Sequence, residues 1–352
     1  MLSTDENALD PKSATGERMK KYRALVDELR VVVVRARHPL ASLSRVCSGM
    51  KKVDQSGDWI VTSQDPFELG IIALLISRWK KIPLHVQVHI DFFSPYFKKE
   101  SFRQCFQAKI APFVLRRADA IRAVSSKIAA YLENDLRIGK MNTLVAPIFV
   151  ASTKIGATPV TIDLHKEFPQ FKFIFLAASR FVKQKNIPFA ISAFGKFASE
   201  RKDVGFVIVG SGPEEKSLRS IISKEGLDSK IKIGLWKNEF FSCMKTADAF
   251  LLSSDYEGWG MTIVEAAAAG KPIIMTDVGC AGEFIHNGEN GLIVPVRNEN
   301  NFVLALNRIY TDKALRESLS RSATLSATRT PSSDEYEKLL LDSWNIANMN
   351  HR

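Results

Sequence analysis

The sequence is poor in the features that define several large classes of protein. Its 352 residues contain four cysteines (Cys47, Cys105, Cys243 and Cys280), widely spaced, with no CxxC pair and no histidine nearby to complete a metal site. This spacing argues against a disulfide framework and against a zinc cluster, and it favours a reducing compartment. The longest apolar run, Leu69–Ile76, is much shorter than the roughly 20 residues that span a bilayer.

Common targeting and catalytic motifs are also missing. The first ten residues have neither the basic nor the apolar part of a secretory signal, so we expect a cytoplasmic protein. The sequence has no Walker A motif, no HExxH zinc motif and no GxSxG elbow. It also has no DxD pair to hold a divalent ion, so no metal is expected.

The charge of the chain is uneven. The net charge is +11, and residues 1–155 hold 25 basic against 15 acidic residues, whereas residues 156–352 hold 24 against 23. A basic half indicates an anionic partner, and nucleic acid, an anionic membrane surface and a phosphorylated acceptor all qualify. Scattered solubilising charge is an equally good explanation. No RNA-binding aromatic signature, zinc finger or heptad array is present, so nucleic acid is not expected.

The pattern of apolar residues predicts two α/β domains. A chain of this length is too long for one ordinary core. Short β-branched runs alternate with helical patterns such as Glu17–Glu28, which is typical of doubly wound parallel sheets. The expected strand before that helix is reduced to Met1–Ser3, so it is either very short or cut by a late start. The other strands expected in the first half are Val31–Val34, Trp59–Thr62, His85–His89, Ala120–Val124 and Thr143–Val145.

A small-residue stretch at Ala151–Pro169 reads as a linker, and a second alternating series follows it. We place the domain boundary at residues 155 and 156, with the second domain ending near residue 330. Ligands in such sheets bind at the carboxyl ends of the strands. The strands expected in this series are Phe173–Ala177, Gly205–Val209, Ile231–Ile233, Ala249–Leu252, Pro272–Thr276 and Leu292–Val294.

The most informative segment runs from Leu251 to Ile274. A strand leads into the glycine-bearing loop DYEGWG, which is followed by a helix expected at Thr262–Ala269. Glycines at the start of a helix let backbone N–H groups face an anion such as a diphosphate. Glu257 in the loop and Glu265 in the helix could each accept hydrogen bonds from sugar hydroxyls. For Glu265 a capping box with Thr262 explains the spacing equally well, and for Glu257 a solvated loop acid is the alternative.

Three further candidates follow strands. Arg180 and Lys185 lie five residues apart, where two cations can clamp a diphosphate, although a plain basic loop fits as well. Gly210 opens the GSGP turn, which is weak as a nicotinamide motif because its third glycine is missing. His89 ends the strand HVQVH, where it could donate a hydrogen bond or titrate near neutrality, although a lone histidine is more often structural.

Taken together, these motifs resemble those of the retaining glycosyltransferases of family 4, the glycosyl transferases group 1, which have the GT-B fold. The resemblance covers nearly the whole chain and is weaker over the first 60 residues. It rests on motifs that occur in the family's order, namely VQVHIDFFS, ADAIRAVSSKIA, SRFVKQKN, GSGPEE, EGWGMTIVEAAAAGKPII and VGCAGEFIHNGENGLIV.

The resemblance implies a role for each matching residue. Glu257 would contact the transferred sugar, and His89 would hydrogen-bond that sugar from the opposite wall of a cleft between two Rossmann-like domains. Glu265 would hold the ribose, while Arg180 and Lys185 would neutralise the leaving diphosphate. The remaining donor-binding residues implied by the family are Gly16, Gly210, Gly258, Trp259, Gly260, Met261 and Thr262.

The implied function is retaining transfer of a sugar from a UDP- or GDP-linked donor to a glycan or lipid-linked acceptor. The expected setting is cell-surface polysaccharide or glycolipid synthesis, at the inner face of the cell membrane if the basic half binds lipid. Family members need no metal or other cofactor, and their C-terminal helix, here residues 335–350, packs back on the first domain.

Three departures from the family pattern occur. The first strand is clipped, Gly16 is a single glycine where many relatives have two, and Asn186 replaces a common glycine after Lys185. The clipped first strand and the basic first half would also fit a catalytically inactive GT-B scaffold. A sugar-nucleotide epimerase or phosphorylase is the rival within the same fold.

Overall fold

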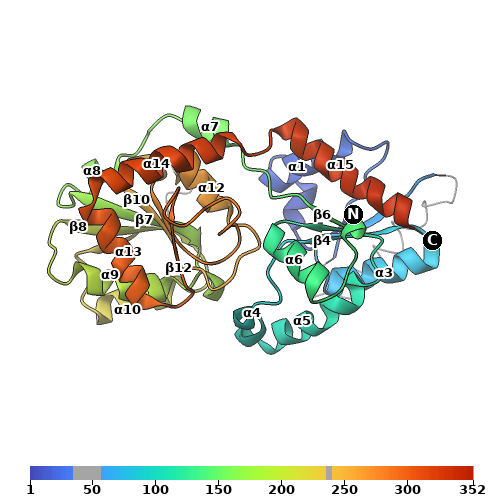
Figure 1. Cartoon of the computed structure of the whole chain (residues 1–352), viewed down its shortest axis with the longest axis horizontal. Helices are drawn as coiled ribbons and strands as arrows, with labels where there is room; N and C mark the ends of the chain where they lie inside the picture. Colours follow the sequence, from blue (N-terminus) through green and yellow to red (C-terminus); the bar gives the residue numbers. More distant parts are fainter. Residues whose placement is uncertain (35–56, 235–239, 352) are drawn as a thin grey trace. The chain divides into compact units, whose positions relative to one another are not determined.

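The computed structural model describes residues 1–34, 57–234 and 240–351, so Cys47 lies outside the described residues. The chain divides into two compact units (Figure 1). The first unit comprises Met1–Phe149 together with Pro331–Arg352, and the second comprises Val150–Thr330. The chain thus leaves the first unit once and returns to it with its last helix.

The first unit is built on a parallel six-stranded sheet in the order β2-β1-β3-β4-β5-β6. The first strand, β1, is only two residues long. It nevertheless pairs on both sides, with Leu2 opposite both Val32 and Ser63. The strands of this sheet are β1 (Leu2–Ser3), β2 (Val32–Val33), β3 (Val61–Ser63), β4 (Leu84–Val88), β5 (Ala120–Ala123) and β6 (Thr143–Val145).

Helices cover this sheet, and the last helix of the chain is one of them. Tyr336, Leu340 and Trp344 of α15 are buried with Met19 and Tyr22 of α1, and Figure 1 shows the two helices side by side. The first unit therefore obtains part of its core from the end of the chain. Its helices are η1 (Glu6–Leu9), α1 (Ala14–Arg23), α3 (Glu68–Lys80), α4 (Pro95–Glu100), α5 (Phe102–Leu115), α6 (Ser126–Asn134), η2 (Lys140–Asn142) and α15 (Ser333–Asn350).

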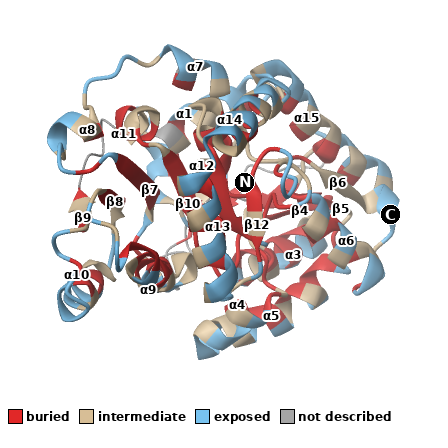
Figure 2. Cartoon of the chain, turned by 60° about the vertical axis from the view of Figure 1, so that its left-hand side comes forward, coloured by how far each residue is buried: buried red, intermediate tan, exposed pale blue. Residues whose placement is uncertain are grey.

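The second unit has its own parallel six-stranded sheet, in the order β12-β11-β10-β7-β8-β9. This is the Rossmann order, in which the direction of winding reverses between the first and fourth strands, here β7 and β10. Figure 2 shows the central strands buried beneath the helices. The strands are β7 (Phe173–Arg180), β8 (Val204–Ser211), β9 (Ile231–Gly234), β10 (Ala249–Leu252), β11 (Ile273–Thr276) and β12 (Leu292–Val294).

The stretch Ala151–Pro169, interpreted from the sequence as a linker, contains two short helices. α7 packs against α12 and α14, and Ile155 and Leu164 are buried. Tertiary packing has therefore ordered a stretch of low helix propensity. The helices of the second unit are α7 (Ser152–Ala157), α8 (Leu164–Glu167), η3 (Lys183–Lys185), α9 (Ile187–Ala198), α10 (Glu215–Lys224), α11 (Phe240–Thr246), α12 (Met261–Ala268), α13 (Glu299–Thr311) and α14 (Lys313–Thr328).

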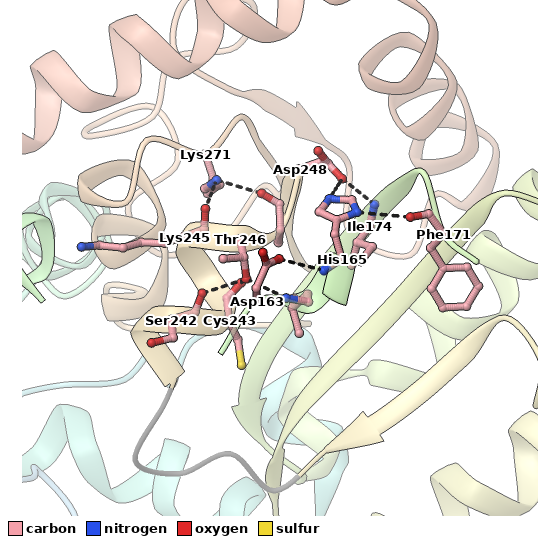
Figure 3. Close-up of polar contacts among 12 residues, drawn as sticks. Asp163, His165, Phe171, Ile174, Ser242, Cys243, Lys245, Thr246, Asp248 and Lys271 are labelled. Carbon is pink, nitrogen blue, oxygen red and sulfur yellow. Dashed lines mark hydrogen bonds and ion pairs between the residues drawn. The ribbon is translucent and has the colours of Figure 1, made fainter. Parts of the chain in front are cut away.

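A polar cluster fastens the amino ends of β7 and β10 (Figure 3). The Asp248 carboxylate accepts the N–H of Ile174 at 2.7 Å and pairs with His165 Nε2 at 3.1 Å. His165 Nδ1 faces the carbonyl of Phe171 at 3.1 Å. Lys271 Nζ donates to two carbonyls before β10. These contacts lie at the edge opposite the carboxyl ends, so we assign them a structural role.

Both units thus have the predicted doubly wound α/β fold, and the fold class is confirmed. Among the described residues, no helix is both long enough and apolar enough to cross a bilayer.

Candidate functional site

The candidate site of the second unit lies where β7 and β10 end side by side. These strands pair directly, with Ala249 opposite Phe175, and they flank the point where the winding of the sheet reverses. Parallel sheets bind ligands in the crevice outside such a point. The two loops that leave this edge carry the candidates Arg180 and Lys185 on one side and Glu257 on the other.

Glu257 is the most firmly held acid of this site. Its carboxylate is buried, with an exposed fraction of 7%, and it forms an ion pair with Lys185. Ser254 Oγ donates to Oε1 at 2.7 Å, and Gln184 Nε2 donates to Oε2 at 3.3 Å. A buried carboxylate with a cation and two neutral donors keeps one orientation. The alternative of a solvated loop acid is therefore wrong for Glu257.

Sequence reasoning missed a second buried acid that holds the two loops together. Asp255 accepts a hydrogen bond from Asn186 Nδ2 at 2.8 Å and a bidentate pair from Arg297 at 2.9 and 2.7 Å. These partners follow β7 and β12, so one carboxylate connects three loops at the carboxyl edge. Asn186 adopts a left-handed conformation with φ of 42°, which asparagine tolerates better than most residues. This accounts for asparagine where a glycine was expected.

Arg180 is the last residue of β7 and is exposed. Within the described part of the chain, its guanidinium has no hydrogen-bond or ion-pair partner. Its five donors are therefore open to an anionic ligand. Lys185 differs, because one of its three donors is used by Glu257.

The start of α12 has an uncapped amino end. Gly260 is the N-cap residue, with φ of 97°, and no side chain of the described residues caps the helix. Such an end leaves backbone N–H groups available for an anion. Of the neighbouring candidates, Gly258 and Trp259 are buried and Met261 is 40% exposed. The Trp259 ring packs near Phe284. This apolar contact accounts for the burial of Trp259 without a ligand.

The capping-box explanation of Glu265 is wrong. Thr262 is already the second residue of α12, and the N-cap position belongs to Gly260. No hydrogen bond or ion pair to the Glu265 side chain is formed by any described residue. Burial raises its pKa from 4.5 to about 7. A desolvated carboxylate without a partner is typical of a ligand-binding position.

Gly210 supports the site from the neighbouring strand. A Cβ atom there would lie 1.9 Å from the carbonyl oxygen of Ser179, so only glycine lets β8 end so close to β7. In the same turn, the Ser211 carbonyl accepts a hydrogen bond from the N–H of Phe181 at 2.9 Å. The GSGP turn therefore fixes the start of the loop that carries Lys185. Direct contact between Gly210 and a ligand stays a prediction.

His89 lies in the first unit, directly after β4. Its Nε2 is 3.0 Å from Gln87 Oε1, which also accepts a hydrogen bond from Arg122 Nη1 at 2.9 Å. Burial, together with the positive charges of Arg122 and Arg18 and the nearby His85, lowers the pKa of His89 well below 6.5. The expectation that His89 titrates near neutrality is therefore wrong, and the ring is neutral at physiological pH.

Gly16, a donor-binding residue implied by the family resemblance, lies in a helix. It is the third residue of α1, and its N–H donates to the N-cap side chain of Ser13 at 2.9 Å. A Cβ atom at this position would lie 1.7 Å from the carbonyl oxygen of Asp10. Close packing of the preceding turn explains the glycine, and its N–H is not free for a phosphate.

Comparison with known proteins finds a family match in the second unit. Residues 162–325 match the family model described as Glycosyl transferases group 1. The chain is 29% identical over 152 residues to an alpha-D-kanosaminyltransferase of Streptomyces kanamyceticus. It is 27% identical over 162 residues to the lipopolysaccharide core biosynthesis glycosyltransferase LpsE of Rhizobium meliloti. These matches cover 43% and 46% of the chain and only 39% and 46% of the relatives' own lengths.

Solved structures with a similar fold extend over both units. HepE of Anabaena, in complex with UDP and glucose, has a TM-score of 0.75 at 18% identity and covers 95% of this chain and 89% of that one. TarM has a TM-score of 0.70 at 17% identity and covers 87% of this chain and 58% of that one. At this level of identity, the likeness shows the two-unit fold.

Proposed function

Starting from the family match of residues 162–325, we propose that this chain is a glycosyltransferase that moves a sugar from a nucleotide-sugar donor to an acceptor hydroxyl. The observation that carries the proposal is the Lys185–Glu257 ion pair at the reversal point of the second sheet. The catalytically inactive scaffold remains the rival, and it predicts no nucleotide binding.

The chemistry of sugar transfer requires charges of this kind close together. As the glycosidic bond breaks, positive charge develops on the anomeric carbon and negative charge on the phosphate oxygen bonded to it. An acid that stabilises the carbon and a cation that stabilises the oxygen must therefore lie close together, as the carboxylate of Glu257 and the ammonium of Lys185 do. Preorganised charges of this kind supply much of the rate enhancement in such reactions.

The other residues complete a donor site under this proposal. Arg180 and the N–H groups at the start of α12 bind the diphosphate, which would leave no need for a metal ion. Glu265 binds the ribose hydroxyls through its unpartnered carboxylate. Several similar structures are complexes with UDP, whose base is uracil, and we propose a UDP-linked donor for this chain.

The finer features of the reaction belong to the same proposal. We propose retention at the anomeric carbon, with attack from the face of the leaving group. Relatives named for lipopolysaccharide core synthesis and for a diphosphoundecaprenol acceptor support an acceptor in cell-surface glycan synthesis.

Donor binding and product analysis test the proposal together. UDP and a panel of UDP- and GDP-sugars are screened by thermal shift, because a ligand that binds the folded state raises its stability by mass action. The expected result is a rise in melting temperature with UDP and one UDP-sugar in the presence of EDTA. Proton NMR of the product should then show retained anomeric configuration. A chain that binds no nucleotide would instead be a scaffold, and an altered free nucleotide-sugar would indicate an epimerase.

We also propose that the first unit docks on an anionic lipid surface through α4 and α5. Phe102, Phe106 and Phe113 have exposed fractions of 99%, 63% and 48%, and their spacing places them with Lys109 on one exposed stripe of α5. Residues 95–117 contain six basic residues and one acidic residue. Exposed aromatic side chains flanked by cations are typical of helices that lie in the headgroup region.

Vesicle flotation tests this surface. The full chain should float with phosphatidylcholine vesicles that contain about 30% phosphatidylglycerol at low salt, and less so in 0.5 M salt. Phe106→Ser should weaken the association severalfold. Leu304→Ser is the matched control, because Leu304 of α13 is similarly exposed, at 60%, but belongs to the second unit. Equal association of Phe106→Ser and the unchanged chain would rule out the surface.

A further inference from the structure

The first unit contains a buried cation that no carboxylate of the described residues neutralises. Arg122 in β5 has an exposed fraction of 1%. Its guanidinium donates to the carbonyls of Ala146 and Pro147, each at 3.1 Å, to Gln87 Oε1 at 2.9 Å and to Tyr336 Oη at 3.0 Å. Burying a charged side chain costs free energy unless hydrogen bonds satisfy it. Because these partners hold the guanidinium in one place, we assign Arg122 a function in positioning its neighbours.

The position of Arg122 determines the orientation of the Gln87 amide. Arginine can only donate, so the Gln87 atom that faces it must be the carbonyl oxygen. That same oxygen lies 3.0 Å from His89 Nε2. An amide oxygen can only accept, so Nε2 must carry the ring proton. The assignment follows from the chain of donors and acceptors, and not from an observed hydrogen atom.

From this geometry we propose that Arg122 and Gln87 are positioning residues that hold His89 in the Nε2–H tautomer, which leaves Nδ1 as an acceptor for a ligand hydroxyl. The proposal rests on the proposed function for its ligand, a sugar hydroxyl. Among the described residues, none makes a hydrogen bond to Nδ1, and His89 is half-buried directly after β4. The group that binds there must therefore be a donor, such as a hydroxyl, and a methoxy group or a fluorine would not serve.

The charged surroundings favour the same state of the ring. Arg122 from β5, Arg18 from α1 and His85 from β4 all face His89, and with burial they lower its pKa. A neutral ring has one donor and one acceptor nitrogen. The donor nitrogen, Nε2, is hydrogen-bonded to Gln87. The acceptor nitrogen, Nδ1, is therefore the one that can bind the ligand.

The last helix contributes to this arrangement. Tyr336 of α15 accepts from Arg122, and its hydroxyl lies 3.3 Å from that of Tyr22 in α1. The guanidinium also lies over the Tyr336 ring, 5.3 Å from its centroid. The end of the chain thus completes the set of partners that holds Arg122 in place.

Nitrogen NMR of the full chain tests the proposal without a donor. The sequence has six histidines, and long-range ¹H–¹⁵N spectra of ¹⁵N-histidine protein distinguish the two tautomers. His89→Phe identifies the His89 signals. We expect the Nε2–H pattern for His89, unchanged between pH 8 and pH 5.5. An Nδ1–H pattern in the unchanged chain would overturn the proposal.

Three variants separate positioning from a merely structural effect. Gln87→Leu removes the acceptor and should give a mixture of tautomers, whereas Gln87→Glu keeps an acceptor oxygen and should retain the Nε2–H form. Thr62→Val is a milder comparison, because Thr62 bonds His85 Nδ1 at 2.7 Å and accepts a long hydrogen bond from Gln87 Nε2 at 3.5 Å. It should change the His85 signals and leave His89 in the Nε2–H form, because Arg122 still fixes the Gln87 oxygen. A pure Nε2–H form in Gln87→Leu would also overturn the proposal.

A second measurement concerns the ligand. If the chain transfers sugar, Gln87→Leu should lower kcat/KM about tenfold, as expected for one misdirected hydrogen bond, and Gln87→Glu should restore most of it. Wild-type kcat/KM in Gln87→Leu together with an altered tautomer would remove the ligand part of the proposal. Absence of any transfer by the unchanged chain would contradict the proposed function and leave the tautomer result standing.

Discussion

At the scale of single residues, the donor site combines one cation that is already paired with one that is free. Lys185 is fixed by Glu257, so its ammonium has a defined place before any ligand binds. Arg180 is exposed at the end of β7 and has no partner among the described residues. Fixed charge lowers the cost of reorganisation during reaction, whereas the free guanidinium can close on the diphosphate.

The free guanidinium leads to the first prediction. Arg180→Ala should lower kcat/KM about 10²-fold, because the leaving diphosphate loses a bidentate partner in the transition state. The measurement is steady-state kinetics with the donor found by thermal shift. Lys183→Ala is the control, because Lys183 is an exposed cation of the same loop, and it should stay within about twofold. If both variants behave alike, the loop acts only as a general basic patch.

Glu265 leads to a prediction about pH. Its pKa is raised to about 7 by burial, so the fraction of carboxylate that can accept ribose hydroxyls increases from pH 6 to pH 8. UDP affinity measured by calorimetry should rise over that interval, and Glu265→Gln should bind more weakly and show a flatter pH profile. Equal pH profiles for both proteins would remove Glu265 from the ribose site.

Titration of Glu265 also affects the stability of the fold, and this effect has the opposite dependence on pH to that of UDP binding. The folded state holds the proton more tightly than the unfolded state, whose glutamate has a pKa near 4.5. The free energy of unfolding without ligand should therefore decrease as pH rises from about 4.5 through about 7. Glu265→Gln removes this decrease, which urea unfolding at several pH values can measure.

Single residues also show how far sequence could predict the site. Glu257, Arg180 and Lys185 stand out because they follow strands that are easily recognised. Asp255 and Arg297 do not, since their pairing joins loops 42 residues apart. Gln87 and Arg122 left a signal that could have been used, because each is polar within a strand of a parallel sheet that is buried on both faces.

At the scale of elements, sequence located strands well and helix ends poorly. β6, β10 and β12 have their predicted bounds, since short β-branched or apolar runs between turns leave little choice of where a strand begins and ends. β7 continues three residues beyond its predicted end because β8 pairs with it as far as Arg180 and Ser211. α1 begins at Ala14, where Ser13 supplies a cap, and not at Glu17. Such details depend on partners distant in sequence.

The contact between β7 and β8 leads to the next prediction. Gly210→Ala would place a methyl group against the backbone of Ser179, which cannot move aside cheaply. We expect a loss of about 2 kcal/mol in the free energy of unfolding and weaker UDP binding, since the loop after β7 must shift. Gly156→Ala in α7 is the control, because its Cβ meets nothing within 4 Å and should be neutral or stabilising. Similar losses for both variants would contradict the steric explanation.

At the scale of the whole molecule, the chain leaves the first unit at Phe149 and returns at Pro331. The core around α1 and α15 therefore depends on residues more than 300 positions apart, such as Tyr22 and Tyr336. The candidate nucleotide-binding residues Arg180, Lys185 and Glu265, in contrast, all lie in the second unit. A substitution that disrupts α15 should therefore destabilise the first unit but leave nucleotide binding by the second unit intact.

Trp344 offers the means to test this division. Its side chain is buried in the first unit, packed edge-on to Tyr22 with ring centroids 5.9 Å apart. Trp344→Ala should destabilise the first unit by about 3–5 kcal/mol through loss of apolar burial and formation of a cavity. UDP binding by the second unit should persist within about twofold, because none of the donor-site elements contains α15.

The matched control is Trp344→Phe, which keeps an aromatic ring and removes a buried indole N–H that has no partner among the described residues. Its cost should be only about 1 kcal/mol, because most of the apolar contact remains and the unpaired donor is gone. The measurements are urea unfolding followed by circular dichroism, and UDP titration of each variant. If UDP affinity fell in proportion to the stability lost in Trp344→Ala, nucleotide binding would depend on an intact first unit. The donor site could then not be assigned to the second unit alone.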